Sequence, residues 1–344
     1  MRKHVFKILK LFFCCITSGV CLLFIFKKVD ISDVKHILSQ ANYIWILIAT
    51  GIGVLKMWIS GFRWRHFGFP CIQLSSKSSF YFYAIGTMTN MTLPFRAGDI
   101  VRTRMIADAL KIPNTKVLGT IASEHMLDFI TLCSLLVGCL TFYSYRWPTE
   151  VIPTVITFFI VAVFCFGGVF LLNKNTHIIK QFKSYISQIL PKFLLFLPNM
   201  IATFYSGFFQ LGSFLNILKV LGLTACTWIA QGLWIYALLY SLGIVENYQL
   251  GFEAVAVLMV MMGIVIMIPS SPGYIGTFHL MVLLGLTQMG VPKSISLSYA
   301  ILAHAHALAM AILIGLYSLW KINIKSSMDF KCQNNINDRK EASL

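Results

Sequence analysis

The chain has 344 residues, of which 58% are apolar and only 12% are charged. A soluble domain carries about twice that charged fraction, so the composition excludes an ordinary water-soluble protein. The formal net charge is +16, but no basic domain is present that would bind nucleic acid. In a membrane protein, an excess of Lys and Arg instead reflects their enrichment in cytoplasmic loops and their attraction to anionic lipid headgroups. We therefore expect an all-α polytopic membrane protein that binds no nucleic acid.

Apolar runs of about 18 residues or more indicate membrane spans. The first follows a basic start, as a signal peptide does, but it passes into Lys27 and Lys28 without a small-residue cleavage site, so we interpret it as an uncleaved span. The second ends at Arg63-Trp64-Arg65, a basic and aromatic group typical of the headgroup layer. In all we expect about six full spans, at residues 9–26, 43–62, 117–143, 151–172, 214–242 and 298–320.

Residues 178–200 differ from the spans because large apolar residues recur near a period of 3.6, with lysines and serines between them. This pattern predicts a helix in the membrane interface, between halves at 43–172 and 214–320. We expect one transmembrane domain over residues 1–322 and a disordered, cytoplasmic tail over 323–344.

Two stretches, Asn90–Arg104 and Ile268–His279, each place Pro-x-x-x-Gly between two apolar runs. We interpret them as helix–break–helix hairpins. Irregular backbone at membrane depth is tolerated only where protein buries it or water reaches it, and paired breaks in two halves point to a transporter's binding site. Ordinary loops between spans are the alternative. The residues that we assign to the breaks are Asn90, Pro94, Gly98, Pro269, Pro272, Gly273 and Gly276.

The distribution of Lys and Arg predicts the orientation. If the N-terminus is cytoplasmic, most of these residues fall on the cytoplasmic side, as the positive-inside rule requires. Both termini are then cytoplasmic, in the cell (inner) membrane. The first hairpin enters from the cytoplasm and the second from outside, which gives an inverted-repeat architecture. If both hairpins cross the bilayer fully, the chain has eight spans and both termini remain cytoplasmic.

The first break carries Arg96, Asp99, Arg102 and Arg104. A charge at the bilayer centre costs ~2.5–3.5 kcal/mol on insertion scales, so such residues are usually functional or paired. Arginine suits phosphate because its planar fork donates two hydrogen bonds, and Asp99 and Arg102 have the spacing of a helical pair. A cytoplasmic loop that follows the positive-inside rule is the alternative.

Other candidates lie outside the first break. Glu124 and Asp128 are four apart on one face, and we prefer structural pairing with an arginine to proton coupling through Glu124 and His125. His304 and His306 are two apart and so face different sides of a helix. Together with His279 they are candidates for a proton path. Neither these histidines nor the scattered cysteines predict a metal site or a cofactor. Ser270 and Ser271 suit either a headgroup or a helix cap.

These motifs resemble the lysylphosphatidylglycerol synthase membrane-region family, also called flippase-like proteins, over about residues 5–322. The family pattern includes Arg-Trp ending the second span and Asn…Leu-Pro-x-Arg-x-Gly-acid-x-x-Arg. This chain matches at Arg63, Trp64, Asn90, Pro94, Arg96, Gly98, Asp99 and Arg102, and at Pro272, Gly273 and Gly276. It departs from the family at three places: His125 replaces an arginine, His279 replaces a glutamate, and His304/His306 stand where an arginine is common.

The resemblance implies a role in moving or handling membrane lipids. Some relatives flip aminoacylated phosphatidylglycerol, and others accompany lipid-linked glycan, hopanoid or cell-envelope pathways. Lysyl transfer is not expected, because little chain follows residue 322. Our first hypothesis is a lipid translocase or lipid-binding transporter for an anionic or lipid-linked envelope precursor. It binds headgroups through Arg96, Arg102, Arg104, Ser270 and Ser271, and the acids and histidines named above form its charge network.

Two alternatives remain. One is a membrane transferase that acts on a polyprenyl-linked sugar, with Asp30 or Asp33 as its only candidate catalytic carboxylates in the first outer loop. The other is a non-catalytic partner of an envelope-synthesis enzyme. The sequence contains no convincing catalytic constellation, which favours transport over catalysis.

Overall fold

The computed structural model describes residues 31–68, 72–142, 213–267 and 271–325, and all of its regular structure in these ranges is helical. The spans predicted at 9–26 and 151–172, the interfacial helix at 178–200 and the tail from residue 326 lie outside the described residues. Pro269 and Ser270 also lie outside them.

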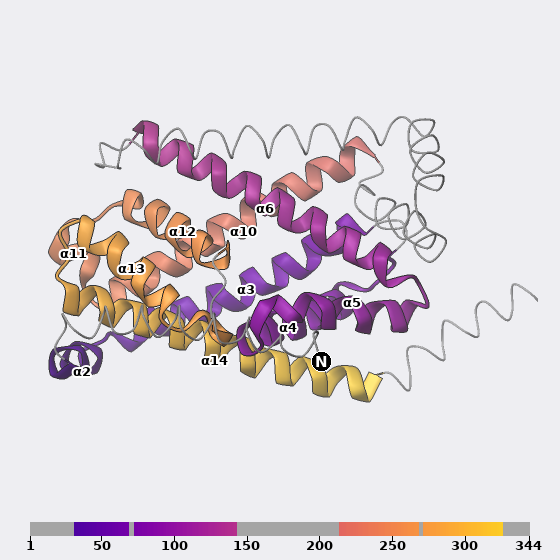
Figure 1. Ribbon diagram of the computed structural model, residues 1–344, viewed down its shortest axis with the longest axis horizontal. Helices are drawn as coiled ribbons and strands as arrows, with labels where there is room; N and C mark the ends of the chain where they lie inside the picture. Colours follow the sequence, from indigo (N-terminus) through magenta and orange to yellow (C-terminus); the bar gives the residue numbers. More distant parts are fainter. Residues whose placement is uncertain (1–30, 69–71, 143–212, 268–270, 326–344) are drawn as a thin grey trace, which may run out of the picture.

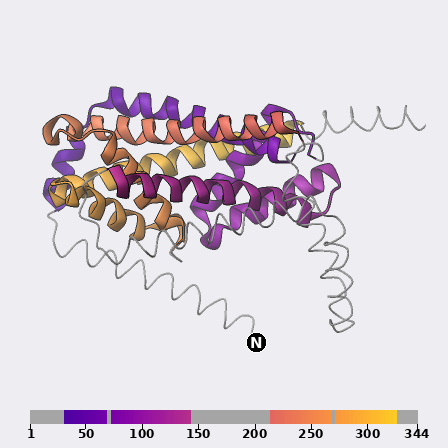
Figure 2. The same cartoon turned by 90° about the horizontal axis from the view of Figure 1, so that it is seen from above.

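Within the described ranges, four helices are long and apolar enough to cross a membrane. They are α3 (Tyr43–Phe67), α6 (Asn114–Phe142), α10 (Phe214–Ser241) and α14 (Lys293–Lys325). Large apolar side chains such as Leu47, Ile229 and Leu313 remain exposed on them, which suits contact with lipid. Seen from above, α3 and α10 run side by side along the long axis (Figure 2). The chain is therefore a multi-pass membrane protein.

Both predicted breaks interrupt helices. The first hairpin consists of α4 (Ser76–Thr92), the 3-10 turn η1 (Pro94–Arg96) and α5 (Ala97–Leu110). The second consists of α12 (Phe252–Met267), the turn η3 (Pro272–Tyr274) and α13 (Thr277–Gln288). In each hairpin the two helices pack against each other, and the hairpins enter from opposite ends of the long helices (Figure 1).

Helix α4 packs against α3, α5, α14 and the turn η3 of the second hairpin. Glycine makes the closest of these approaches possible. A Cβ on Gly98 would lie 2.1 Å from the carbonyl oxygen of Gly86, so α5 meets α4 backbone to backbone. A Cβ on Gly61 would lie 2.9 Å from the Cα of Phe80, so α3 also approaches α4 closely. These contacts hold α5 and α3 close against α4 on either side of the first break.

Helix starts follow ordinary capping chemistry. The side chain of Asn42 accepts a hydrogen bond from the Ile44 amide at the start of α3, and Ser75 and Ser213 cap α4 and α10 in the same way. Two short helices, α2 (Ile31–Ser39) and α11 (Ile244–Tyr248), are absent from the sequence-based expectations. Helix α2 packs against α14.

Candidate functional site

The two hairpin breaks meet inside the protein. A Cβ on Gly273 would lie 3.1 Å from the carbonyl oxygen of Met91, so the second break rests on the end of α4. The Nε2 atom of His304 lies 2.6 Å from the Gly273 carbonyl oxygen, which ties the same break to α14. The turns η1 and η3 are also in contact. Segments about 180 residues apart in the chain thus form one junction.

Each break contains a non-glycine residue with left-handed backbone. These are Arg96, with φ 51°, and Tyr274, with φ 58°. Gly273 and Gly276 also have positive φ, at 71° and 89°, which glycine adopts readily. A left-handed residue with a side chain costs on the order of 1 kcal/mol, and it persists only where surrounding structure holds it. Such backbone strain is concentrated at functional sites, which makes the junction a candidate functional site.

A buried network of ion pairs lies beside the junction. Glu124 is 1% exposed and accepts hydrogen bonds from Arg63 at 3.1 Å and Arg102 at 2.9 Å. Arg63 also donates to both oxygens of Asp128, at 2.6 and 2.8 Å. Trp228 donates to Asp128 at 3.2 Å. The network joins α3, α5, α6 and α10, which is the structural pairing that we preferred for Glu124 and Asp128.

The Arg63-Trp64 prediction is wrong in one respect. Arg63 and Trp64 are 1% and 0% exposed, so they lie inside the protein and not in the headgroup layer. The Trp64 indole donates to Thr120, and its ring lies 4.3 Å from the Arg102 guanidinium carbon. The Tyr83 ring lies 5.1 Å from the same carbon. Arg102 is therefore held by one carboxylate and two aromatic rings.

A second charged group is centred on Asp99. Its carboxylate accepts hydrogen bonds from Asn90 at 3.1 Å and from Arg96 at 3.2 Å, and the Nε2 atom of His125 lies 3.0 Å from it. The predicted pairing of Asp99 with Arg102 is therefore wrong: Asp99 pairs with Arg96. Packing of α5 against α6 turns Arg102 toward Glu124 instead.

Lys56 is a site residue that the sequence analysis missed. It lies near the middle of α3, is half-buried and donates a hydrogen bond to the side-chain oxygen of Gln231 on α10. Among the described residues it forms no ion pair. A single lysine within an apolar run was the available signal, since such charges are usually functional.

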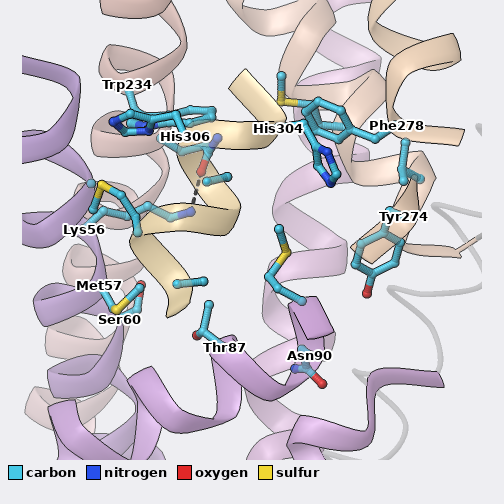
Figure 3. A pocket seen from close by; sticks show the side chains of 18 of the residues that line it. Lys56, Met57, Ser60, Thr87, Asn90, Trp234, Tyr274, Phe278, His304 and His306 are labelled. Atoms are coloured by element: carbon cyan, nitrogen blue, oxygen red, sulfur yellow. Dashed lines mark hydrogen bonds between the residues drawn. The ribbon is translucent and has the colours of Figure 1, made fainter. Parts of the chain in front are cut away.

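Two adjoining cavities occupy the junction. The charged cavity, of about 450 Å³, lies among α3, α4, α5, α6 and α10. The aromatic cavity, of about 340 Å³, extends toward α13 and α14 and is seen in Figure 3 with Trp234, Tyr274, Phe278, His304 and His306. Both cavities are lined by Lys56, Tyr83, Thr87, Asn90, Arg96, Gln231 and Met262, so we describe them together as the joined cavity.

The charged cavity has an excess of basic side chains. Its lining includes four of them, Lys56, Arg63, Arg96 and Arg102, against three acidic ones, Asp99, Glu124 and Asp128. With His125 neutral, the lining carries one net positive charge. Low-dielectric surroundings strengthen the attraction of such a charge for an anion. The geometry therefore suits an anionic ligand with an apolar part that extends into the aromatic cavity.

The predicted histidines lie in different surroundings. His304 holds the second break, whereas His306 lies 2.9 Å from the Thr50 hydroxyl and accepts a hydrogen bond from Trp234 at 3.1 Å. The two face different sides of α14, as predicted. The ring of His279 lies 4.9 Å from that of His304, centroid to centroid, and lines neither cavity. The described residues contain no cluster of three or more side chains suited to a metal ion.

Several other candidates lie away from the joined cavity. The Arg104 side chain is 80% exposed and pairs with Asp108 at 3.7 Å. Ser271 lines neither cavity, and its hydroxyl donates to the Ile275 carbonyl at 3.2 Å, within the turn. Asp33 is exposed on α2, and Asp30 lies outside the described residues.

Comparison with known proteins identifies a family but no individual relative. The family model described as "Lysylphosphatidylglycerol synthase TM region" matches residues 8–315. No curated protein and no solved structure matches the chain significantly. The matched range includes all of α3 to α13 and most of α14, and therefore every described residue of the joined cavity.

Proposed function

We propose a function from one premise: the chain belongs to the lysylphosphatidylglycerol synthase TM region family. The family and the four long apolar helices associate it with membrane lipid or envelope metabolism. We infer that it is a lipid translocase or lipid-binding transporter for an anionic or lipid-linked envelope precursor. Its binding site is the joined cavity.

One observation carries this proposal. The excess of basic over acidic side chains lies where the two hairpin breaks meet, within a bundle whose outer faces are apolar. A charged headgroup does not cross the hydrocarbon core unaided, because transfer of an ion out of water is costly. A protein that lowers this barrier needs a polar, cationic compartment inside its spans, and the charged cavity supplies it.

Within the site, Arg96 is the arginine best placed to contact the headgroup. It lines both cavities and its side chain is 35% exposed, whereas that of Arg102 is 4% exposed and bound to Glu124. We assign headgroup contact to Arg96, and we assign Arg102 and Arg63 to holding α6 against α5 and α3. Arg104 is exposed and lies outside the joined cavity, so we assign it no headgroup contact there.

The aromatic cavity suits the apolar part of the same ligand. Met57, Met262 and Met310 line it together with Trp234 and Phe278. Methionine side chains are flexible and polarisable and adapt to irregular apolar shapes. Chains of variable length or branching can therefore pack there while the phosphate stays in the charged cavity.

Alternating access follows from the hairpins. They enter from opposite ends and touch at their breaks, so a shift of either hairpin would open one side of the joined cavity. We propose the inverted-repeat arrangement on this basis, with cytoplasmic termini in the inner membrane. Pro94 and Pro272, each at the first position of its turn, keep the helices broken at this point.

The test is transbilayer movement of a fluorescent phosphatidylglycerol in proteoliposomes, measured by dithionite quenching. Arg96→Gln should lower the rate about tenfold or more, because a charged hydrogen-bond partner of the headgroup is lost. Arg104→Gln is the matched control and should leave the rate unchanged. Equal rates in wild type and Arg96→Gln would contradict the assignment of Arg96, and a wild-type rate no higher than that of empty vesicles would contradict transport itself.

A further inference from the structure

The charges that line the charged cavity can be assigned to partners one by one. Arg63 and Arg102 are matched by Glu124 and Asp128. Arg96 is matched by Asp99. Each of these carboxylates accepts at least two hydrogen bonds from cations, histidine, tryptophan or asparagine. With histidine counted as neutral, the group around Glu124 and Asp128 and the group around Asp99 therefore carry no net charge.

Lys56 is the cation that this pairing leaves over. Its ammonium has three donors, and the side-chain oxygen of Gln231 takes one of them. No acidic side chain in the described part of the chain forms an ion pair with it. Lys56 also lines both cavities, and Figure 3 shows it extending from α3 into the shared space. An uncompensated ammonium near the middle of a span is costly unless a ligand neutralises it.

Gln231 adds a second polar group at the same point. Its oxygen is bound to Lys56, which leaves the two N–H donors of its amide for a ligand. Gln231 also lines both cavities. An ammonium and an amide side by side match the two unesterified oxygens of one phosphodiester.

We propose, building on the function proposed above, that Lys56 and Gln231 form a phosphate subsite, and that the joined cavity prefers a lipid with one phosphodiester charge. A lipid diphosphate carries more negative charge than the single excess cation can balance. To bind it, an arginine would have to leave the carboxylate with which it is paired, which is unfavourable. An aminoacylated headgroup carries an ammonium, and every described carboxylate that lines the cavity is already paired. The preferred headgroup is therefore uncharged beyond its phosphate.

Ligand preference in the wild-type protein is the first test. Short-chain fluorescent phosphatidylglycerol, lysyl-phosphatidylglycerol, phosphatidylcholine and a polyprenyl diphosphate are titrated into the full-length protein in neutral detergent. We expect phosphatidylglycerol to bind most tightly. Tighter binding of the diphosphate or of the lysyl ester would overturn the one-charge preference. If none of the four lipids binds, the proposed function itself fails.

Substitution of Lys56 is the second test. Lys56→Met should weaken phosphatidylglycerol binding about tenfold or more and remove its advantage over phosphatidylcholine, because the lost contact is charge-assisted. Lys56→Arg keeps the charge and should retain the preference. Lys219→Met is the matched control, since Lys219 is exposed on α10 and lines neither cavity of the joined pair. Wild-type preference in a folded Lys56→Met variant would overturn the subsite, and so would equal losses in Lys56→Met and Lys219→Met.

Discussion

The His304 imidazole donates from Nε2 to the carbonyl oxygen of Gly273, 2.6 Å away. This contact ties the second hairpin break to the middle of α14, and Gly273 in turn rests on the end of α4. The ring of His304 also lines the aromatic cavity. One histidine thus connects the conformation of the break with the wall of the joined cavity.

We predict that His304→Ala loosens the second break. Loss of one buried hydrogen bond costs about 1–2 kcal/mol, so the amides of residues 271–277 should exchange hydrogen about tenfold faster. His306→Ala is the control, because His306 contacts Thr50 and Trp234 and not the break. Equal protection of residues 271–277 in His304→Ala and wild type would show that the contact does not hold the turn.

Gly98→Ala should destabilise the first hairpin. The added Cβ would lie 2.1 Å from the Gly86 carbonyl oxygen and 2.6 Å from the Asn90 amide nitrogen, and backbone atoms cannot yield as a flexible side chain can. Overpacking of this kind costs about 1–3 kcal/mol or more, which should appear as a lower melting temperature in detergent. Gly51→Ala, where nothing lies within 4 Å of the added Cβ, should be neutral or stabilising. Similar melting temperatures for both variants would contradict the close packing of α4 and α5.

Arg102 and Arg104 lie two residues apart on α5, but the side chain of Arg102 is buried and that of Arg104 is exposed. Arg102→Met leaves a buried carboxylate short of a cation and should cost about 3–5 kcal/mol. Arg104→Met removes an exposed pair with Asp108 and should cost at most about 1 kcal/mol. Unfolding free energies measured by denaturant titration in micelles compare the two. A loss for Arg104→Met as large as that for Arg102→Met would show that α5 is not oriented as described.

Local sequence patterns were enough to place the four long described helices and both breaks. The span predicted at 43–62 is α3, at 43–67, and the span predicted at 214–242 is α10, at 214–241. Pro94 and Pro272 interrupt helices where expected, because a proline lacks the amide donor and fixes its own backbone. The short helices α2 and α11 were missed, since neither has enough residues to show a clear period.

The pairing of charges could not be obtained from the sequence. Spacing alone suggested Asp99 with Arg102, but the partner of Arg102 is Glu124, 22 residues away. Arg63 and Trp64 looked like a headgroup anchor because their partners lie 56 to 65 residues further along the chain. Lys56 drew no attention because its partner, Gln231, is neutral and 175 residues distant. The packing of α5 against α6, and of α3 against α6 and α10, brings these groups together.

Photocrosslinking of an anionic lipid with a diazirine on its headgroup tests whether the joined cavity takes a lipid headgroup. The lipid is incorporated into vesicles with the wild-type protein, irradiated, and the labelled residues are mapped by mass spectrometry. We predict labels on α3 around Lys56, on α4 and η1 around Asn90 and Arg96, and on α10 around Gln231, with competition by unlabelled phosphatidylglycerol. Labels confined to outward-facing residues such as Leu47, Ile229 and Leu313, without competition, would contradict a headgroup site between the two hairpins.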